Sequence, residues 1–134
     1  MFAHFTVNEA NAMLPSIISR HRELVNLKNE ITNIQTELGT DHKYVSSLKD
    51  QILKKQELNA AITSFYEALE EMEDSGVVVK SVDEGLIDFP SLRFGEEIWL
   101  CWKDGETEIK FWHAKDEGFN GRRPIEAYDL EKFR

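Results

Sequence analysis

Hydrophobic residues recur at helical spacing through most of the first half of the chain. One series repeats every seventh residue from Ile17, and a second does so before Gly76. Apolar positions spaced by three, four and seven residues share one face of an α-helix, so the pattern predicts two amphipathic helices with coiled-coil-like spacing. The two stripes consist of Leu14, Ile17, Leu24, Leu27, Ile31, Ile34 and Leu38, and then of Val45, Leu48, Ile52, Leu58, Ile62, Phe65, Leu69 and Met72.

The start of the first helix carries several local signals. Thr6 and Glu9 have the spacing of a capping box, and Phe5 is placed to act as a hydrophobic staple. We therefore expect the helix to begin at Val7. Pro15 lacks the N–H that an interior helical residue donates, so a kink or a restart of the helix is expected there.

The break between the two helices is short. Gly39-Thr40-Asp41 interrupts the first stripe, because glycine suits the left-handed conformation past a helix end and threonine or aspartate can cap the next helix. The second helix is expected from about His42 to Asp74, where Gly76 stops it. Two long helices joined by so short a turn pack antiparallel, which predicts a helical arm over residues 1–76, on the order of 45 Å long.

The second half of the chain has the pattern of extended structure. Val77-Val78-Val79 and Leu86-Ile87-Asp88-Phe89 are separated by the polar Asp83-Glu84-Gly85, which predicts two short strands. A hairpin is expected to turn at Asp104-Gly105, because these residues suit a type I′ turn. We therefore predict an α+β fold, in which a long antiparallel helical hairpin precedes a small antiparallel sheet, the β lobe, over residues 77–134 of one structural domain.

The expected turn sets a register for the hairpin. Leu100 then faces Ile109, and Cys101 lies on the opposite face from His113. One face is expected to form the core and carries Ile98, Leu100, Trp102, Ile109 and Phe111. The other face mixes aromatic and charged residues, as at an interface or cleft, and carries Glu97, Trp99, Cys101, Glu108, Lys110 and Trp112. The stretch from Gly118 to Arg134 is expected to be irregular, with a final helical turn.

Composition and charge restrict the classes of function. The chain has 134 residues, 41% of them hydrophobic, and its 16 basic and 25 acidic residues give a formal net charge of −9. Such a charge repels phosphate backbones and anionic membranes, so we expect neither nucleic acid nor a membrane as the main partner. The single cysteine cannot form an intrachain disulfide, and the sequence shows neither a signal-peptide pattern nor an apolar run of the ~20 residues that span a membrane. We expect a soluble, cytoplasmic protein.

Residues 86–122 hold all three tryptophans, the cysteine and many ionisable groups. Histidine and carboxylates suit zinc, iron or manganese, and an arginine can bind a carboxylate through two hydrogen bonds. The candidate ligand or metal site consists of Asp88, Glu106, His113, Asp116 and Arg122, and the candidate interface of Trp99, Cys101 and Trp112. Each has a structural alternative: a buried cysteine without chemistry, an Arg122 salt bridge to Asp88 or Glu106, and aromatics that form the core.

Short motifs along the chain follow a recognisable order. They are Thr-Val-Asn-Glu-Ala-Asn-Ala-Met-Leu-Pro at residues 6–15, then Val79-Lys80, Asp83-Glu84-Gly85-Leu86, Asp88-Phe89-Pro90, Leu100-Cys101-Trp102, Gly105-Glu106, Trp112-His113, Gly118-Phe119 and Arg122. This order resembles the uncharacterised prokaryotic family catalogued as domain of unknown function 2203, over nearly the whole chain. The motifs of the second half are specific because rare residues recur in fixed order. The resemblance implies no activity, cofactor or catalytic residue.

The sequence supports two functional hypotheses of different classes. The first is a non-enzymatic interaction or assembly protein whose helical arm self-associates, with a homodimer favoured and a further protein partner allowed. The alternative is a small-molecule or metal-binding site on the β lobe, which leaves enzymatic activity and the cofactor open. A holdase-like arm resembling prefoldin is disfavoured, because the predicted β-hairpin follows both helices instead of separating them.

Overall fold

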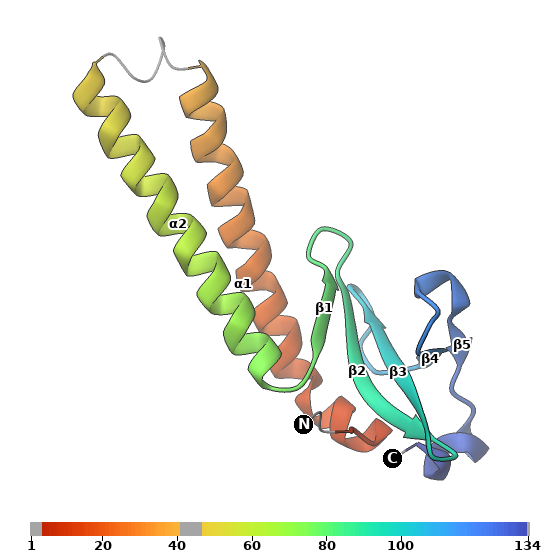
Figure 1. The fold of residues 1–134 in the computed structure, drawn as a ribbon. Helices are drawn as coiled ribbons and strands as arrows, with labels where there is room; N and C mark the ends of the chain where they lie inside the picture. The colour runs from red at the N-terminus through yellow and green to blue at the C-terminus, as the bar shows by residue number, and fades with distance from the viewer. Residues whose placement is uncertain (1–3, 41–46, 134) are drawn as a thin grey trace. The chain divides into compact units, whose positions relative to one another are not determined.

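The computed structural model describes residues 4–40 and 47–133 of the chain. Helix α1 (Val7–Thr40) and helix α2 (Leu48–Asp74) precede a five-stranded antiparallel sheet (Figure 1). This arrangement confirms the predicted α+β fold, including the start of the first helix at Val7 and the end of the second at Asp74. Within the described ranges, no helix is both long enough and apolar enough to cross a membrane.

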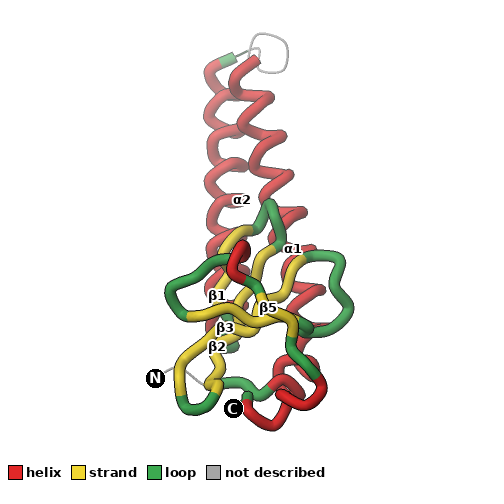
Figure 2. Tube along the Cα trace, turned by 90° about the vertical axis from the view of Figure 1, so that its right-hand side faces the viewer, coloured by secondary structure: helices red, strands yellow, loops and turns green. Residues whose placement is uncertain are grey.

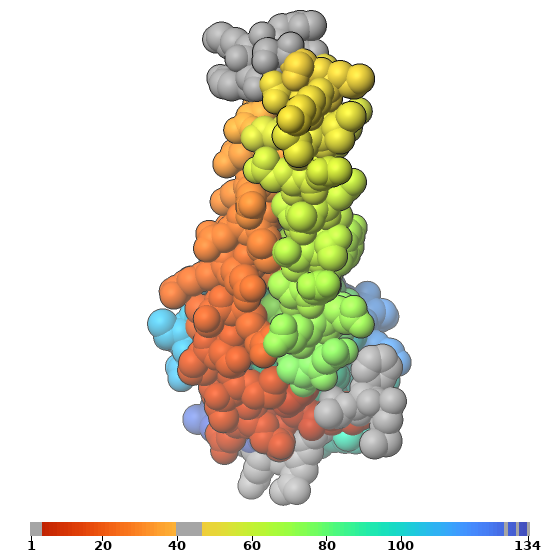
Figure 3. Space-filling model, turned by 90° about the vertical axis from the view of Figure 1, so that its left-hand side faces the viewer, coloured from red at the N-terminus to blue at the C-terminus, as the bar shows by residue number. Residues whose placement is uncertain are grey.

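The contacts divide the chain into two compact units. The first comprises Met1–His21 and Met72–Arg134, and the second comprises Arg22–Glu71. In the second unit α1 and α2 lie side by side (Figures 1 and 3), with Leu24, Ile34 and Ala61 buried. Lys54 of α2 forms a salt bridge with Glu37 of α1. Helix α1 continues through Gly39 to Thr40, although the helix was expected to be interrupted at Gly39. The expected start of the second helix at His42 lies outside the described residues.

The capping box at the start of α1 has the predicted geometry. The Thr6 N–H donates to Glu9 Oε1 at 2.9 Å, and the Glu9 N–H donates to Thr6 Oγ1 at 3.1 Å. The bond from the Thr6 backbone lowers the pKa of Glu9. Pro15 lies inside the helix, and the ribbon bends within its red N-terminal part (Figure 1).

The strands follow one another in the sheet in chain order, as neighbouring yellow segments in Figure 2. They are β1 (Val78–Ser81), β2 (Leu86–Arg93), β3 (Glu96–Lys103), β4 (Phe111–Ala114) and β5 (Arg123–Pro124). The last stretch adds the 3-10 helices η2 (Phe119–Gly121) and η3 (Ala127–Lys132). The paired segments β2 and β3 are joined by a two-residue turn, Phe94-Gly95, whose positive φ angles are those of a type I′ turn.

The core of the first unit lies between one face of the sheet and the start of α1. The rings of Phe5 and Phe89 meet edge to face at 5.6 Å, and those of His21 and Trp102 at 5.5 Å. The sheet residues buried on this face are Ile87, Phe89, Ser91, Ile98, Leu100, Trp102 and Trp112.

The predicted register of the last hairpin is wrong by three residues. Ile98 lies opposite Ala114 instead of Phe111, because β4 begins only at Phe111. The backbone groups of the intervening loop bind partners outside the hairpin. The Ile109 N–H donates to Asn11 Oδ1, and the Lys110 carbonyl accepts from the Ile125 N–H. The loop therefore lies outside the ladder, which the turn signal alone does not reveal.

The shift by an odd number of residues exchanges the faces of β4. Trp112 lies on the core face opposite Leu100, whereas His113 shares the other face with Cys101. The turn at Asp104-Gly105 is present, but only Gly105 has a positive φ, +100°, so it is not the expected type I′ turn, which needs two such residues.

Candidate functional site

Three buried side chains with metal-ligand atoms meet on the face of the sheet opposite the core. Asp88 of β2 pairs with Cys101 of β3, and His113 of β4 pairs with Trp99 of β3. Trp99 and Cys101 are two residues apart, so all of these residues share one face. The ligand atoms of Asp88, Cys101 and His113 lie within 4.8 Å of one another, and none of the three residues is more than 2% exposed. We call these three residues the donor cluster.

Both ring nitrogens of His113 have partners. Nε2 lies 3.0 Å from Asp88 Oδ2, and Nδ1 lies 3.0 Å from the Ala114 carbonyl oxygen, to which it must donate. Burial lowers the pKa of His113, but the interactions of the ring with Asp88, with the neighbouring Cys101 side chain and with the Ala114 carbonyl, together with the charge of Asp88, outweigh burial and raise this pKa to about 10. The imidazole is therefore protonated at neutral pH and donates through Nε2 to the carboxylate.

The second oxygen of Asp88 has no partner. Oδ1 is buried and accepts no hydrogen bond from any described residue. A buried carboxylate oxygen without a partner costs free energy, since its interaction with water is lost and nothing replaces it. This oxygen belongs to a residue of the donor cluster, and its lone pairs are not engaged by any described residue.

The cluster does not form a nucleophile relay. A relay of the cysteine–histidine–carboxylate type needs one ring nitrogen for the carboxylate and the other for the thiol. In this structure Nε2 of His113 binds Asp88 and Nδ1 binds a backbone carbonyl, so neither nitrogen remains to activate Cys101 while the other is held by the acid.

A divalent transition-metal ion fits the donor cluster. Thiolate, imidazole and carboxylate are donors for zinc and ferrous iron, and the thiolate selects against magnesium and calcium. Tetrahedral ligands at about 2.0–2.3 Å from zinc are roughly 3.5 Å apart, which is compatible with the separations among these donors. Two anionic ligands and a neutral imidazole leave no net charge around such an ion, which suits a buried site. The bond from His113 Nδ1 to Ala114 would orient Nε2 toward the ion.

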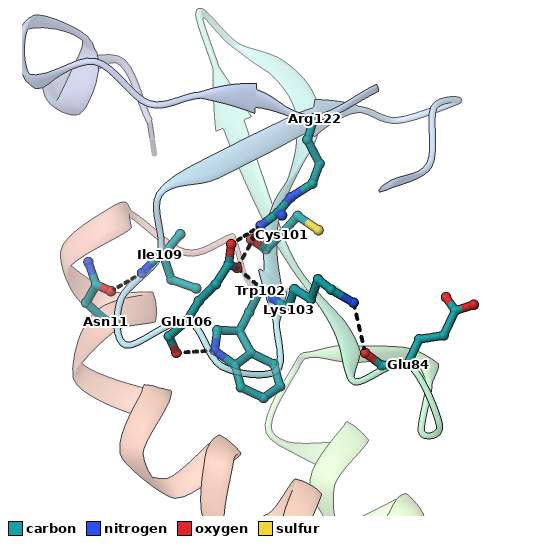
Figure 4. Close-up of polar contacts among 8 residues, drawn as sticks. All are labelled: Asn11, Glu84, Cys101, Trp102, Lys103, Glu106, Ile109 and Arg122. Atoms are coloured by element: carbon teal, nitrogen blue, oxygen red, sulfur yellow. Dashed lines mark hydrogen bonds and ion pairs between the residues drawn. The ribbon is translucent and has the colours of Figure 1, made fainter. Parts of the chain in front are cut away.

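Glu106 and Arg122 form a separate structural group (Figure 4). The Arg122 guanidinium donates to both Glu106 oxygens, at 2.7 and 2.8 Å, and to the Cys101 carbonyl at 3.2 Å. Glu106 Oε1 also accepts from the Lys103 N–H, and its backbone carbonyl accepts from the Trp102 indole. These bonds hold the loop that follows β3, as expected of the structural salt bridge proposed from the sequence.

The remaining candidates are dispersed. Asp116 is exposed and does not belong to the donor cluster. Trp112 was expected beside Trp99 and Cys101, but it is buried on the core face, where the guanidiniums of Arg93 and Arg123 stack on its ring. Cys101 is 1% exposed, so its side chain does not form an accessible interface.

Sequence reasoning placed Asp88 and His113 in the candidate ligand site, but it placed Cys101 in the candidate interface. The error follows directly from the register, which placed Cys101 and His113 on opposite faces. The signal that could have shown the offset is the polar stretch Glu106-Thr107-Glu108, which lacks the alternation of a strand.

Comparison with known proteins gives one match. The family model described as "Uncharacterized conserved protein (DUF2203)" matches residues 3–125, nearly the whole chain. No curated protein and no solved structure matches the chain.

Proposed function

Because the chain belongs to the DUF2203 family, which is described only as an uncharacterized conserved protein, we propose a function from the chain's own geometry: its β lobe binds one divalent transition-metal ion through Asp88, Cys101 and His113. Zinc and ferrous iron are the ions that these donors favour.

The observation that carries this proposal is the buried, partnerless Oδ1 of Asp88, a residue whose carboxylate belongs to a buried set of metal donors. A purely structural ion pair between Asp88 and His113 accounts for Oδ2 and Nε2 only. It leaves Oδ1 unsatisfied. A metal ion uses all three side chains and replaces the proton that His113 otherwise holds.

The donor cluster supplies three ligands, and a tetrahedral ion takes four. Structural zinc sites are commonly closed by four protein ligands, whereas sites that bind or activate a ligand keep one position for water or substrate. Three protein donors therefore favour an ion with one exchangeable position over a purely structural ion.

Cobalt titration of the chelator-stripped full chain tests the proposal. We expect saturation at one ion per chain, with visible d–d bands and a thiolate-to-cobalt charge-transfer band that Cys101→Ser abolishes. Asp88→Asn removes one anionic ligand and should weaken cobalt binding by at least about tenfold. The matched change Asp116→Asn, at an exposed aspartate outside the cluster, should leave binding unchanged.

Absence of the charge-transfer band in the folded wild-type chain would overturn the proposal. Equal cobalt affinity in Asp88→Asn and in the wild type would do the same. Circular dichroism of each variant shows whether it is folded, and His113→Gln provides a second ligand variant if Asp88→Asn unfolds.

We also infer a second function, self-association through the helical arm. Exposed apolar side chains on α2 favour it: Leu48 is 73% exposed, Ile52 49%, Leu53 53% and Tyr66 62%. Large apolar side chains of this kind on one helix are stabilised when a second helix covers them, and the coiled-coil-like spacing suits a second copy of this chain. A homodimer that presents the metal-binding lobe is the assembly that we propose.

The reducing cytoplasm is the compartment that we propose for this protein. A thiolate ligand must stay reduced to hold a metal ion, and the single Cys101 contributes no disulfide to the fold.

A further inference from the structure

Strand β4, which supplies His113, is held against β3 by a short ladder. It has four residues, and its ladder with β3 ends at the pair of Cys101 with Phe111. Beyond this pair the two strands separate into the loop over residues 104–110. The ends of short ladders open most easily, because few contacts hold them. His113 lies only two pairs inside this end, so its position depends on what holds the end closed.

Arg122 contacts both strands at this end of the ladder. Its guanidinium donates to the Cys101 carbonyl of β3 at 3.2 Å, and it lies 4.0 Å from the centre of the Phe111 ring of β4. The Arg122 side chain is only 12% exposed. A hydrogen bond and a cation–π contact that are shielded from water are stronger than the same contacts at the surface. Arg122 therefore links β4 to β3 at the terminal pair.

Glu106 fixes the position of Arg122 (Figure 4). Both oxygens of its carboxylate accept from the guanidinium, at 2.7 and 2.8 Å, and Oε1 also accepts from the Lys103 N–H at the end of β3. A guanidinium that binds both oxygens of a carboxylate is restricted in orientation as well as in position. We call Glu106 and Arg122 the clamp, because together they connect the end of β3 with β4.

The three members of the donor cluster differ in how much they depend on the clamp. Asp88 and Cys101 pair directly between β2 and β3, which are eight residues long and paired along their whole length. His113 comes from the short β4. A metal ligand must be held within about 0.5 Å of its working position. Loss of the clamp should therefore displace His113 while Asp88 and Cys101 remain together.

We propose that the clamp holds β4 where His113 reaches the ion of the donor cluster, which makes Arg122 a positioning residue of the metal site. The inference rests on the proposed function, because it concerns the ligands of that ion. Groups that orient a metal ligand without touching the ion commonly change metal affinity by 10- to 100-fold. The Glu106–Arg122 ion pair thus has a role in metal binding in addition to holding the loop after β3.

Cobalt binding to the full chain and to Arg122→Met tests the proposal. Methionine keeps an apolar stem beside Phe111 but cannot bind Cys101 and Glu106. We expect the cobalt Kd to rise by at least about tenfold. At saturating cobalt the thiolate-to-cobalt band should persist. The hyperfine-shifted imidazole N–H signal in the proton NMR spectrum, which His113→Gln identifies by its absence, should be lost.

Arg123→Met is the matched control. Arg123 is the next residue of the chain, but its guanidinium stacks on Trp112 and pairs with Glu117, so it does not link β4 to β3. This variant should keep the cobalt affinity within about threefold and retain the imidazole signal. Glu106→Gln preserves the shape of the side chain and weakens its hold on Arg122, and it should shift both readouts in the direction of Arg122→Met. Circular dichroism shows which variants are folded, and Glu106→Gln decides the matter if Arg122→Met unfolds.

The outcomes separate this inference from the proposed function. Cobalt bound by the wild type with its thiolate band, together with a folded Arg122→Met that keeps the wild-type affinity or the imidazole signal, would overturn the clamp inference alone. Loss of the thiolate band along with the imidazole signal in Arg122→Met, or an equal loss of affinity in Arg123→Met, would indicate general loosening of the lobe and would overturn it as well. A folded wild-type chain that binds no cobalt would overturn both proposals.

Discussion

His113 must lose a proton if the donor cluster binds a metal ion. Without an ion, the His113 ring is protonated and donates from Nε2 to Asp88 and from Nδ1 to the Ala114 carbonyl. Its side chain is 2% exposed. With an ion, Nε2 must be free of that proton, because only a neutral imidazole is a ligand. The same side chain therefore links stability, pH and metal binding.

The pH dependence of the metal-free protein follows from this residue. Its pKa is raised to about 10 in the folded state, above the ordinary value of 6.5, so the folded protein holds the proton more tightly than the unfolded chain. The stability that it contributes is complete below pH 6.5 and is lost as the pH rises through about 10. We expect the free energy of unfolding to fall by a few kcal/mol across this range, at about 1.4 kcal/mol per pKa unit.

Urea unfolding of chelator-treated protein at several pH values measures this loss. His113→Gln is the control, because lysine and tyrosine side chains also titrate near the upper end of the range. The wild type should lose more stability than the variant between about pH 6.5 and 10. Parallel curves for the two proteins would show that the His113 proton is not held by folding.

At the residue scale, sequence reasoning nominated Asp88 and His113, but it grouped them with Glu106, Asp116 and Arg122 and assigned Cys101 to a separate interface. The ionisable side chains of Asp88 and His113, among the aromatic residues of the second half, were enough to nominate these two residues. The cluster itself depends on which residues pair across β3 and β4, and the loop before β4 is held by the Ile109 N–H, which donates to Asn11 Oδ1, ninety-eight residues away. The polar stretch Glu106-Thr107-Glu108 indicates a loop, but it does not identify the distant partner that holds this loop.

At the scale of elements, the turn before β2 depends on one glycine. Gly85 has φ +68°, and its carbonyl accepts from the Asp104 N–H at 2.8 Å. A Cβ added there would collide with Cβ of Asp104 and approach the His21 ring at 3.3 Å. The two turns of the lobe are thus packed closely against each other, and only glycine fits between them.

Gly85→Ala should destabilise the fold by at least about 3 kcal/mol, from a left-handed backbone and overpacking together. Gly95→Ala is the matched control, since Gly95 has φ +79° but no atom within 4 Å of the added Cβ. That variant should lose only about 1–2 kcal/mol. Thermal or urea unfolding compares the two, and equal losses would mean that the close approach at Gly85 is not rigid.

The helices and the first strands were predictable because their signals are local. The capping box at Thr6, the heptad spacing and Gly76 mark the helix ends, and β-branched runs mark β1 and β2. Strand β5, the 3-10 helices and the long loop before β4 were not predicted in detail. Their backbone groups are satisfied by distant partners, such as the Lys110 carbonyl that accepts from the Ile125 N–H.

At the scale of the whole molecule, self-association should depend on the exposed apolar residues of α2. Ile52→Glu places a charge among Leu48, Ile52 and Leu53 and should shift a dimer toward monomer in sedimentation velocity. Gln56→Glu adds the same charge at an exposed position one turn away and should leave the dimer intact. A wild-type chain that stays monomeric at high micromolar concentration would contradict the proposed homodimer.

The central claim is that the donor cluster holds one transition-metal ion, and a native mass spectrum tests it most directly. The full chain is stripped with chelator, supplied with one equivalent of zinc and measured beside Asp88→Asn and Asp116→Asn. We expect one zinc per chain in the wild type and in Asp116→Asn, and a large loss of zinc in Asp88→Asn. A wild-type chain without zinc, or zinc retained equally in Asp88→Asn, would contradict the account.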